Sequence, residues 1–278
     1  MYSPPPDPAD AQRLADAHDK AAAALGATPH GPLAWGWHGR TLSRRADHSE
    51  HGACWLRLLA APADQAGGKL WTGTADAARS VPRAVHRPEL HGLHDHSDGP
   101  YAYRAELTSY VDAPICAPSP VIRQELALAS TWWPTLRTNL AHLAAVRTDR
   151  VAVRQEWIDR SVPRFTGAPA PQITEWATAH GDLHFANLTT SGPVILDWEG
   201  WGIAPYGYDA ALLYVYSLLA PATAARVKHE FADVLDSPKG RAAQMIVAAE
   251  LLQSASRGDH PELVASLRTL IEEISEAL

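Results

Sequence analysis

Three polar side chains in one short stretch of the chain have the chemistry of a metal-assisted reaction centre. Residues 180–188 read HGDLHFANL and residues 194–200 read VILDWEG, so Asp182, Asn187 and Asp197 follow one another in that order. The first segment is predicted to be a loop, because Gly181 and alternating polar residues break any helical face, and the second a buried strand ending in Asp197. A turn at residues 191–193 would join them into a hairpin and bring two carboxylates and one carboxamide together.

This set of side chains suits Mg²⁺, which prefers oxygen ligands and usually shares them with substrate phosphates. Phosphoryl transfer requires the protein mainly to position the reactants and to neutralise charge. We therefore predict that Asn187 and Asp197 bind the metal ion, and that Asp182 orients an attacking hydroxyl group.

A zinc site is the alternative interpretation of the same stretch. Histidine and carboxylate side chains bind zinc, and His180, Asp182 and His184 lie close together in the sequence. That interpretation leaves Asn187 and the apolar segment before Asp197 without a role. A second group of histidines, at positions 91, 94 and 96, is expected to be solvated, and positions 94–100 are predicted to form a turn.

The overall composition excludes several classes of protein. The chain has 278 residues, of which 46% are hydrophobic and 20% charged, enough for one large domain or two lobes with a sizeable core. A formal net charge of -7 argues against a nucleic-acid partner. The two cysteines, Cys54 and Cys116, make no disulfide framework, and neither a signal peptide nor an apolar span of about 20 residues is evident. We expect reduced thiols, a cytoplasmic location and no membrane partner.

The residues up to position 112 are predicted to form a small sheet lobe. A helix is expected over residues 7–26, capped by Asp7, with Pro8 in its first turn and Gly26 at its end. Strands are predicted over residues 33–37, 41–45, 53–59, 90–93 and 101–110, with a short helix over 70–78. Three prolines in residues 111–120 end this pattern and mark a linker.

The residues after the linker are predicted to be mainly helical. Ser130 is expected to cap a helix with Trp133, Leu136, Leu140 and Leu143 on one face. Further helices are predicted over residues 150–161, 209–219, 222–235, 241–256 and 261–277. The fold class predicted is therefore α+β, with a small sheet lobe over residues 1–112 and a larger helical lobe over residues 113–278 that contains the polar hairpin.

The pattern HGDLHFANL…ILDWEGWG…PYGYDAALL, within residues 180–213, resembles the aminoglycoside phosphotransferase and choline kinase-like family, which has the bilobal protein kinase-like fold. The resemblance implies that Asp182 is the catalytic base or hydroxyl-orienting group. It implies that Asn187 and Asp197 bind Mg²⁺ and the nucleotide phosphates, and that Asp209 braces the catalytic loop. His180 is expected to hold this loop through hydrogen bonds of its ring. The first lobe would bind the nucleotide, with adenine near the backbone of residues 107–111, and the second lobe would bind the acceptor.

The third predicted strand departs from the family pattern. Relatives are expected to place a lysine there to hold the nucleotide phosphates, whereas this chain has Arg57, a permanent cation with a planar fork. Lys69 is the alternative phosphate ligand. The usual glutamate partner on the following helix is missing, because no glutamate occurs between Glu50 and Glu89, and Asp76 is the acidic candidate on that helix.

The function predicted is an ATP- or GTP-dependent, Mg²⁺-dependent O-phosphotransferase acting on a hydroxyl group of a small molecule, for which an antibiotic such as an aminoglycoside is one candidate. The altered strand motivates an alternative, a non-catalytic nucleotide-binding regulator of the same fold. The partners expected are a nucleoside triphosphate and a small hydroxylated substrate. The candidates for the acceptor pocket are acidic and aromatic residues, namely Trp157, Glu199, Trp201 and Tyr206.

Overall fold

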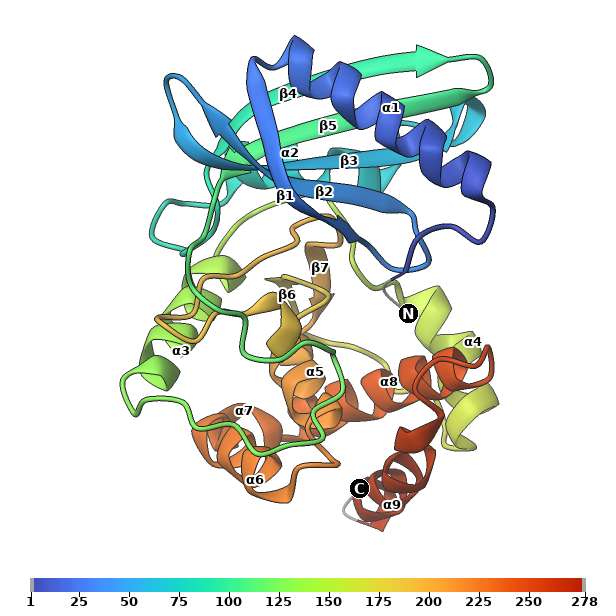
Figure 1. Cartoon of the computed structure of the whole chain (residues 1–278). Helices are drawn as coiled ribbons and strands as arrows, with labels where there is room; N and C mark the ends of the chain where they lie inside the picture. Colours follow the sequence, from blue (N-terminus) through green and yellow to red (C-terminus); the bar gives the residue numbers. More distant parts are fainter. Residues whose placement is uncertain (1–2, 277–278) are drawn as a thin grey trace. The chain divides into compact units, whose positions relative to one another are not determined.

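The computed structural model describes residues 3–276, and this part of the chain divides into two compact units (Figure 1). The first unit comprises the residues up to Arg79 together with Arg87–Asp112. The second comprises Ser80–His86 and the residues from Ala113 onward. None of the described helices combines the length and the apolar character needed to cross a membrane.

The first unit is built on an antiparallel sheet, which within the described residues has five strands in the order β1-β2-β3-β5-β4. The strands are β1 (Ala27–Trp35), β2 (Thr41–His48), β3 (Gly52–Pro62), β4 (Leu90–Asp98) and β5 (Tyr101–Ser109). The central strands carry the apolar side chains, since Leu42, Leu56 and Leu58 are fully buried. The predicted sheet of antiparallel strands is confirmed.

Two helices accompany this sheet, α1 (Pro8–Ala24) and α2 (Lys69–Ser80). The carboxylate of Asp7 caps α1 by accepting a hydrogen bond from the Ala9 amide (2.8 Å), and Pro8 occupies the first turn, where its missing N–H has no cost. Figure 1 shows α1 lying across the sheet, and its buried face joins Leu14 and Ala21 to the same apolar cluster as Leu56.

The predicted turn over residues 94–100 is wrong, because β4 continues to Asp98 and leaves a two-residue connection to β5. Cross-strand pairing explains the longer strand. Asp95 lies opposite Arg104, and both oxygens of its carboxylate accept hydrogen bonds from the guanidinium, at 2.7 and 2.6 Å. The ring of His96 stacks on Tyr103 of β5, with centroids 4.8 Å apart.

The second unit is mainly helical. Its helices are α3 (Trp132–Ala144), α4 (Gln155–Thr166), α5 (Tyr208–Tyr216), α6 (Pro221–Glu230), α7 (Ala232–Leu235), α8 (Pro238–Ala255) and α9 (Val264–Glu276). The chain also forms three short 3₁₀ helices within the described residues, at Ala63–Gln65 in the first unit and at Phe185–Asn187 and Pro261–Leu263 in the second. Helix α8 packs against α4, α5 and α9, and every residue of α5 is buried. A short antiparallel pair, β6 (Trp176–Ala179) and β7 (Gly202–Pro205), flanks the polar hairpin in sequence.

Several predicted helix boundaries differ from the structure, and three of the differences have a visible local cause or consequence. The cap of α3 is Thr131 rather than Ser130, and its side chain makes no capping hydrogen bond. The helix predicted over 222–235 is divided at Phe231 into α6 and α7. The helix predicted from residue 150 begins only at Gln155, because the backbone of residues 150–153 is hydrogen-bonded to Ile203 on β7 and so is extended.

Candidate active site

The hairpin predicted around residues 191–193 is present, but the strand predicted before Asp197 is wrong. Only Ile195 of that segment pairs as in a sheet, in an isolated antiparallel bridge with Leu188 within the described residues. The amide of Leu196 then donates to the carbonyl of Asn187 (2.9 Å), and the chain turns away at Asp197, whose φ is +59°. Left-handed backbone at a non-glycine residue costs about 1–2 kcal/mol, which is tolerated most readily by Asp and Asn.

Side chains from distant parts of the second unit fix the hairpin in place. The indole nitrogen of Trp132 donates to the carbonyl of Thr189 (2.8 Å), and the amide of Asn139 donates to the carbonyl of Pro193 (3.0 Å). The backbone amide of Cys116 donates to the carbonyl of Leu188 (2.7 Å). These partners lie on α3 and in the extended segment before it, 50 or more residues away, so sequence spacing gives no signal for them.

Asp209, in the first turn of α5, holds the beginning of the loop formed by residues 180–188, which is the catalytic-loop candidate. Its carboxylate accepts hydrogen bonds from the backbone amides of His180 (2.7 Å) and Gly181 (3.0 Å). Burial raises the pKa of Asp209 above its usual value, although His180 and the two amide donors act in the opposite direction. Gly181 has a φ of +79°, and a Cβ there would come within 3.1 Å of Ala152 and of the carbonyl of Gly200. The backbone directly before Asp182 is therefore held by Asp209 on one side and closely packed against Ala152 and Gly200 on the other.

The ring of His180 does not hold the loop through hydrogen bonds, contrary to expectation. It is fully buried, and neither ring nitrogen has a hydrogen-bond partner among the described residues. The ring instead packs edge-on against Trp198, with centroids 5.1 Å apart at an interplanar angle of 90°. The loop is held at this point by the backbone amide of His180 and by aromatic packing.

Asp182, His184 and Asn187 form a compact polar cluster. The side-chain nitrogen Nδ2 of Asn187 donates to the backbone carbonyl of Asp182 (3.0 Å), lies 3.4 Å from its carboxylate oxygen Oδ2, and lies 3.3 Å from Nε2 of His184. Every hydrogen bond that the described residues make with the Asn187 side chain thus uses its nitrogen, which leaves the oxygen Oδ1 for another partner.

The carboxylate of Asp182 is open to solvent on one side and polar on the other. About half of its side-chain surface is exposed, and Oδ1 lies 3.6 Å from Nε2 of His184. The surrounding protein atoms tend to raise the pKa of Asp182, but His184, His180 and the hydrogen bond from Asn187 outweigh them, so that the pKa lies below its usual value. Asp182 is accordingly ionised at neutral pH and able to accept a hydrogen bond from a hydroxyl group.

The chemistry of Asn187 and Asp197 fits a hard divalent cation. Asn187 offers Oδ1, and the exposed carboxylate of Asp197 follows the residue that is hydrogen-bonded across the hairpin to Asn187. Mg²⁺ is usually held by one or two protein oxygens together with water and phosphate oxygens. Among residues 3–276 no group of three or more His, Cys, Asp or Glu side chains is arranged to hold a metal ion, so the zinc interpretation gains no support.

Arg57 lies in the other unit, where its partner is a residue that the sequence did not suggest. It stands on β3 directly opposite Glu106 on β5, and Nη1 lies 3.4 Å from Oε2 of that glutamate. The hydroxyl of Thr74, on α2, donates to the same oxygen (3.0 Å), and Glu106 is almost fully buried. The helix thus contributes a hydroxyl group and the neighbouring strand the carboxylate. Lys69, the alternative, is exposed at the start of α2.

Arg150 is a further residue that sequence reasoning missed. Its guanidinium donates to the carbonyls of Glu199 (3.1 Å) and Trp201 (3.2 Å) and lies over the Trp201 ring, 5.1 Å from its centroid. Because both hydrogen-bond acceptors are backbone carbonyls about 50 residues later, nothing in the sequence marks them. Trp201 itself is fully buried, so the expectation that it lines an acceptor pocket is wrong.

Comparison with known proteins assigns the family. A family model described as "Phosphotransferase enzyme family" matches residues 4–243. The chain belongs to this family. The predicted class of enzyme, a phosphotransferase, is confirmed by this membership, as is the resemblance seen in the sequence. A search of curated protein sequences gives no significant match.

Solved structures of similar fold include other phosphotransferases. A thermostable mutant of aminoglycoside phosphotransferase APH(4)-Ia, in a ternary complex with ADP and hygromycin B, aligns with a TM-score of 0.61 at 11% identity, over 92% of this chain and 97% of that chain. The amicoumacin kinase hAmiN, in complex with AMP-PNP, Ca²⁺ and Ami, aligns with a TM-score of 0.57 at 10% identity, over 98% and 96%. The choline kinase LicA from Streptococcus pneumoniae aligns with a TM-score of 0.51 at 11% identity, over 96% and 100%. These similarities confirm the predicted protein kinase-like α+β fold.

Proposed function

We propose that this phosphotransferase transfers the terminal phosphoryl group of a nucleoside triphosphate to an alcohol group of a small molecule, in a reaction that depends on Mg²⁺. The observation that carries the proposal is the braced hairpin, in which an ionised aspartate, a carboxamide with a fixed orientation and an exposed aspartate lie close together along the backbone. These groups are Asp182, Asn187 and Asp197.

Asp182 would orient the acceptor. With its pKa lowered, the carboxylate is present in its charged form at neutral pH and can accept a hydrogen bond from the attacking hydroxyl group, whose proton it would receive as the O–P bond forms. Because the backbone on its N-terminal side is held by Asp209, and its own carbonyl is bound by Asn187, the carboxylate is positioned before substrate arrives.

Asn187 and Asp197 would hold the metal ion. The nitrogen of Asn187 is engaged by Asp182 and His184, so its oxygen is directed away from them and is available to a cation. Mg²⁺ bound there would offset the negative charge of the nucleotide phosphates. Arg57, held by Glu106, is the residue of the other unit that we propose as a phosphate ligand, with Lys69 as the alternative.

The proposed substrates follow from the chemistry of the family. Two of the similar structures contain ADP or AMP-PNP, and one of these two also contains Ca²⁺, a hard divalent cation like Mg²⁺. One of them also contains hygromycin B, and another of the enzymes is a choline kinase. For this chain we propose ATP or GTP as donor and a polyhydroxylated antibiotic or an amino alcohol as acceptor class.

A phosphotransfer screen tests the proposal. Purified protein, Mg²⁺ and radiolabelled ATP or GTP are incubated with panels of antibiotics, amino alcohols, sugars and nucleosides, and labelled product is measured. We expect transfer to at least one class, reduced more than tenfold in Asp182→Asn with nucleotide affinity retained. Nucleotide binding without transfer to any acceptor, and without slow hydrolysis, would instead support the non-catalytic regulator.

Asp197 allows the metal role to be separated from folding. Asp197→Asn keeps a residue that tolerates left-handed backbone, and Asp197→Gly relieves the backbone cost of about 1–2 kcal/mol. Both variants should fold at least nearly as well as the wild type, yet both should lose the increase in nucleotide affinity that Mg²⁺ provides, measured by calorimetry with and without the ion. An unchanged increase would exclude Asp197 as a ligand.

A further inference from the structure

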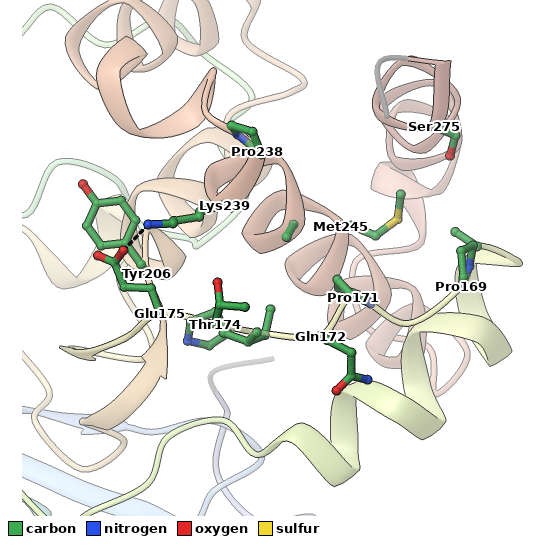
Figure 2. Close-up of a pocket in the computed structure, with 14 residues that line it drawn as sticks. Pro169, Pro171, Gln172, Thr174, Glu175, Tyr206, Pro238, Lys239, Met245 and Ser275 are labelled. Carbon is green, nitrogen blue, oxygen red and sulfur yellow. Dashed lines mark hydrogen bonds and ion pairs between the residues drawn. The ribbon is translucent and has the colours of Figure 1, made fainter.

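The second unit contains a cavity of about 370 Å³ (Figure 2). Tyr206, expected from the sequence as a candidate for the acceptor pocket, lines this cavity, which lies apart from the proposed reaction centre. It is open to solvent on one side and bounded by the segment before β6, the end of β7, the first turns of α8 and the C-terminal part of α9. A volume of this size is in the range of small-molecule sites.

The cavity lies at the far end of the β6–β7 pair from the catalytic-loop candidate. Trp176 pairs with Pro205 at the cavity end, and Ala179 pairs with Gly202 at the end that leads into His180. From Glu175, which lines the cavity, five extended residues lead to His180, a span of about 16 Å. A small molecule in the cavity would therefore not reach Asp182.

The walls of the cavity are apolar and fixed in shape. Pro169, Pro171, Pro205, Pro238, Ala242 and Met245 contribute to its lining. Proline has a restricted φ and no N–H, so these walls offer rigid apolar surface and few hydrogen-bond donors. The segment before β6, which lines the cavity, is anchored by Gln155 of α4, which donates to the carbonyl of Pro171 (3.0 Å) and accepts from the amide of Ile173 (3.1 Å). The space is thus built into the fold.

One end of the cavity is charged. Lys239 and Glu175 form an ion pair there, and Figure 2 shows the ring of Tyr206 beside them, whereas Met245 and Pro169 lie toward the other end. Both side chains of the pair are about half exposed, so either can be released to water at little cost. Lys239 also stands in the first turn of α8, where the helix dipole adds positive potential and favours an anion over a cation.

We propose that this cavity is a second ligand site, for a small molecule with a flat apolar body and one carboxylate. The body would lie between the proline, Ala242 and Met245 side chains. The carboxylate would take the place of Glu175 as the partner of Lys239, and Glu175 would turn to solvent. Binding would occur without occupancy of the nucleotide or acceptor sites, so the inference does not depend on the proposed function.

Calorimetry with 2-naphthoate as probe tests the site. For a ligand of about 13 heavy atoms we expect saturable binding with a dissociation constant on the order of 1 mM. Ala242→Phe, which fills the cavity, should weaken binding at least tenfold. Lys239→Met should weaken 2-naphthoate about fivefold or more and leave the neutral 2-naphthamide unchanged.

Three results of these probe measurements would overturn the proposal. They are the absence of saturable binding at 10 mM probe, equal affinity of Ala242→Phe and wild type, and tighter binding of the cation 2-naphthylmethylammonium than of 2-naphthoate. If Ala242→Phe fails to fold, the comparison of acid, amide and amine on wild type and Lys239→Met still decides the matter. Binding that disappears on addition of Mg²⁺ and ATP would also contradict it, because the site would then coincide with the nucleotide site.

Discussion

Replacing Asp209 by asparagine should both destabilise the protein and slow its reaction. The carboxylate accepts two backbone hydrogen bonds, at 2.7 and 3.0 Å, in a nearly fully buried position. Asparagine keeps the size but has one acceptor oxygen, so one of the two amides must face an NH₂ group. A hydrogen bond to a charged group contributes about 1.5–3 kcal/mol, and burial of the charge, which raises the pKa of Asp209, offsets part of it. We expect a net loss of about 2 kcal/mol in the free energy of unfolding.

Urea unfolding followed by tryptophan fluorescence at pH 7 measures this loss, and phosphotransfer kinetics measure the effect on the loop. Because His180 and Gly181 directly precede Asp182, a displacement of about 1 Å should reduce kcat by ten- to a hundredfold. Asp233→Asn is the matched control. Asp233 is also in the first turn of a helix and accepts two hydrogen bonds from Arg137, both at 2.9 Å, but it is 62% exposed, so its loss should cost less than about 1 kcal/mol. The bracing role would be refuted if Asp209→Asn lost less than about 0.5 kcal/mol in the free energy of unfolding, similar to the loss for Asp233→Asn, and kept its kcat unchanged.

Three further predictions concern pH, packing and thiol chemistry. The pKa of Asp182 is lowered in the folded state, so its contribution to stability is present above its unfolded pKa of about 3.9 and is lost as the pH falls through the folded value. The stability difference between wild type and Asp182→Asn should thus shift in favour of wild type as pH rises from about 2 to 5, and a difference independent of pH in denaturant titrations would contradict the lowered pKa. Gly202→Ala should destabilise the second unit by about 2 kcal/mol or more and lower its thermal midpoint, because the new Cβ would lie 2.8 Å from backbone atoms of Arg150 and Ala152. A midpoint within about 1 °C of wild type, which corresponds to a stability change on the order of 0.3 kcal/mol or less, would show that the backbone around Arg150 and Ala152 moves aside at little cost. Burial raises the pKa of Cys116 to about 12 and also raises that of Cys54, so neither thiol should react with a disulfide reagent at pH 8 until the protein is unfolded, and rapid titration of either in the native protein would count against this.

The order of elements in the chain was determined largely by local sequence. Asp7 and Pro8 specify the start of α1 through capping and fixed φ, and alternating apolar residues specify the strands that form the sheet. The polar residues of the hairpin could be singled out from the sequence because their types and spacing suit phosphoryl transfer. The family match agrees with the predicted class of enzyme, a phosphotransferase. These signals act over a few residues, and such signals can be read without knowing the fold.

Tertiary structure decided which distant groups complete each site. The pairing of β3 with β5 places Glu106 opposite Arg57, and this register depends on the whole sheet. At Asp197 the backbone is left-handed, where its apolar neighbours predicted a strand. The hairpin that carries it is held by Trp132 and Asn139 from α3, which local sequence does not indicate. Every residue has a backbone carbonyl, so the sequence does not indicate which carbonyl accepts a given side-chain hydrogen bond. Contacts of this kind can be identified only in the folded structure.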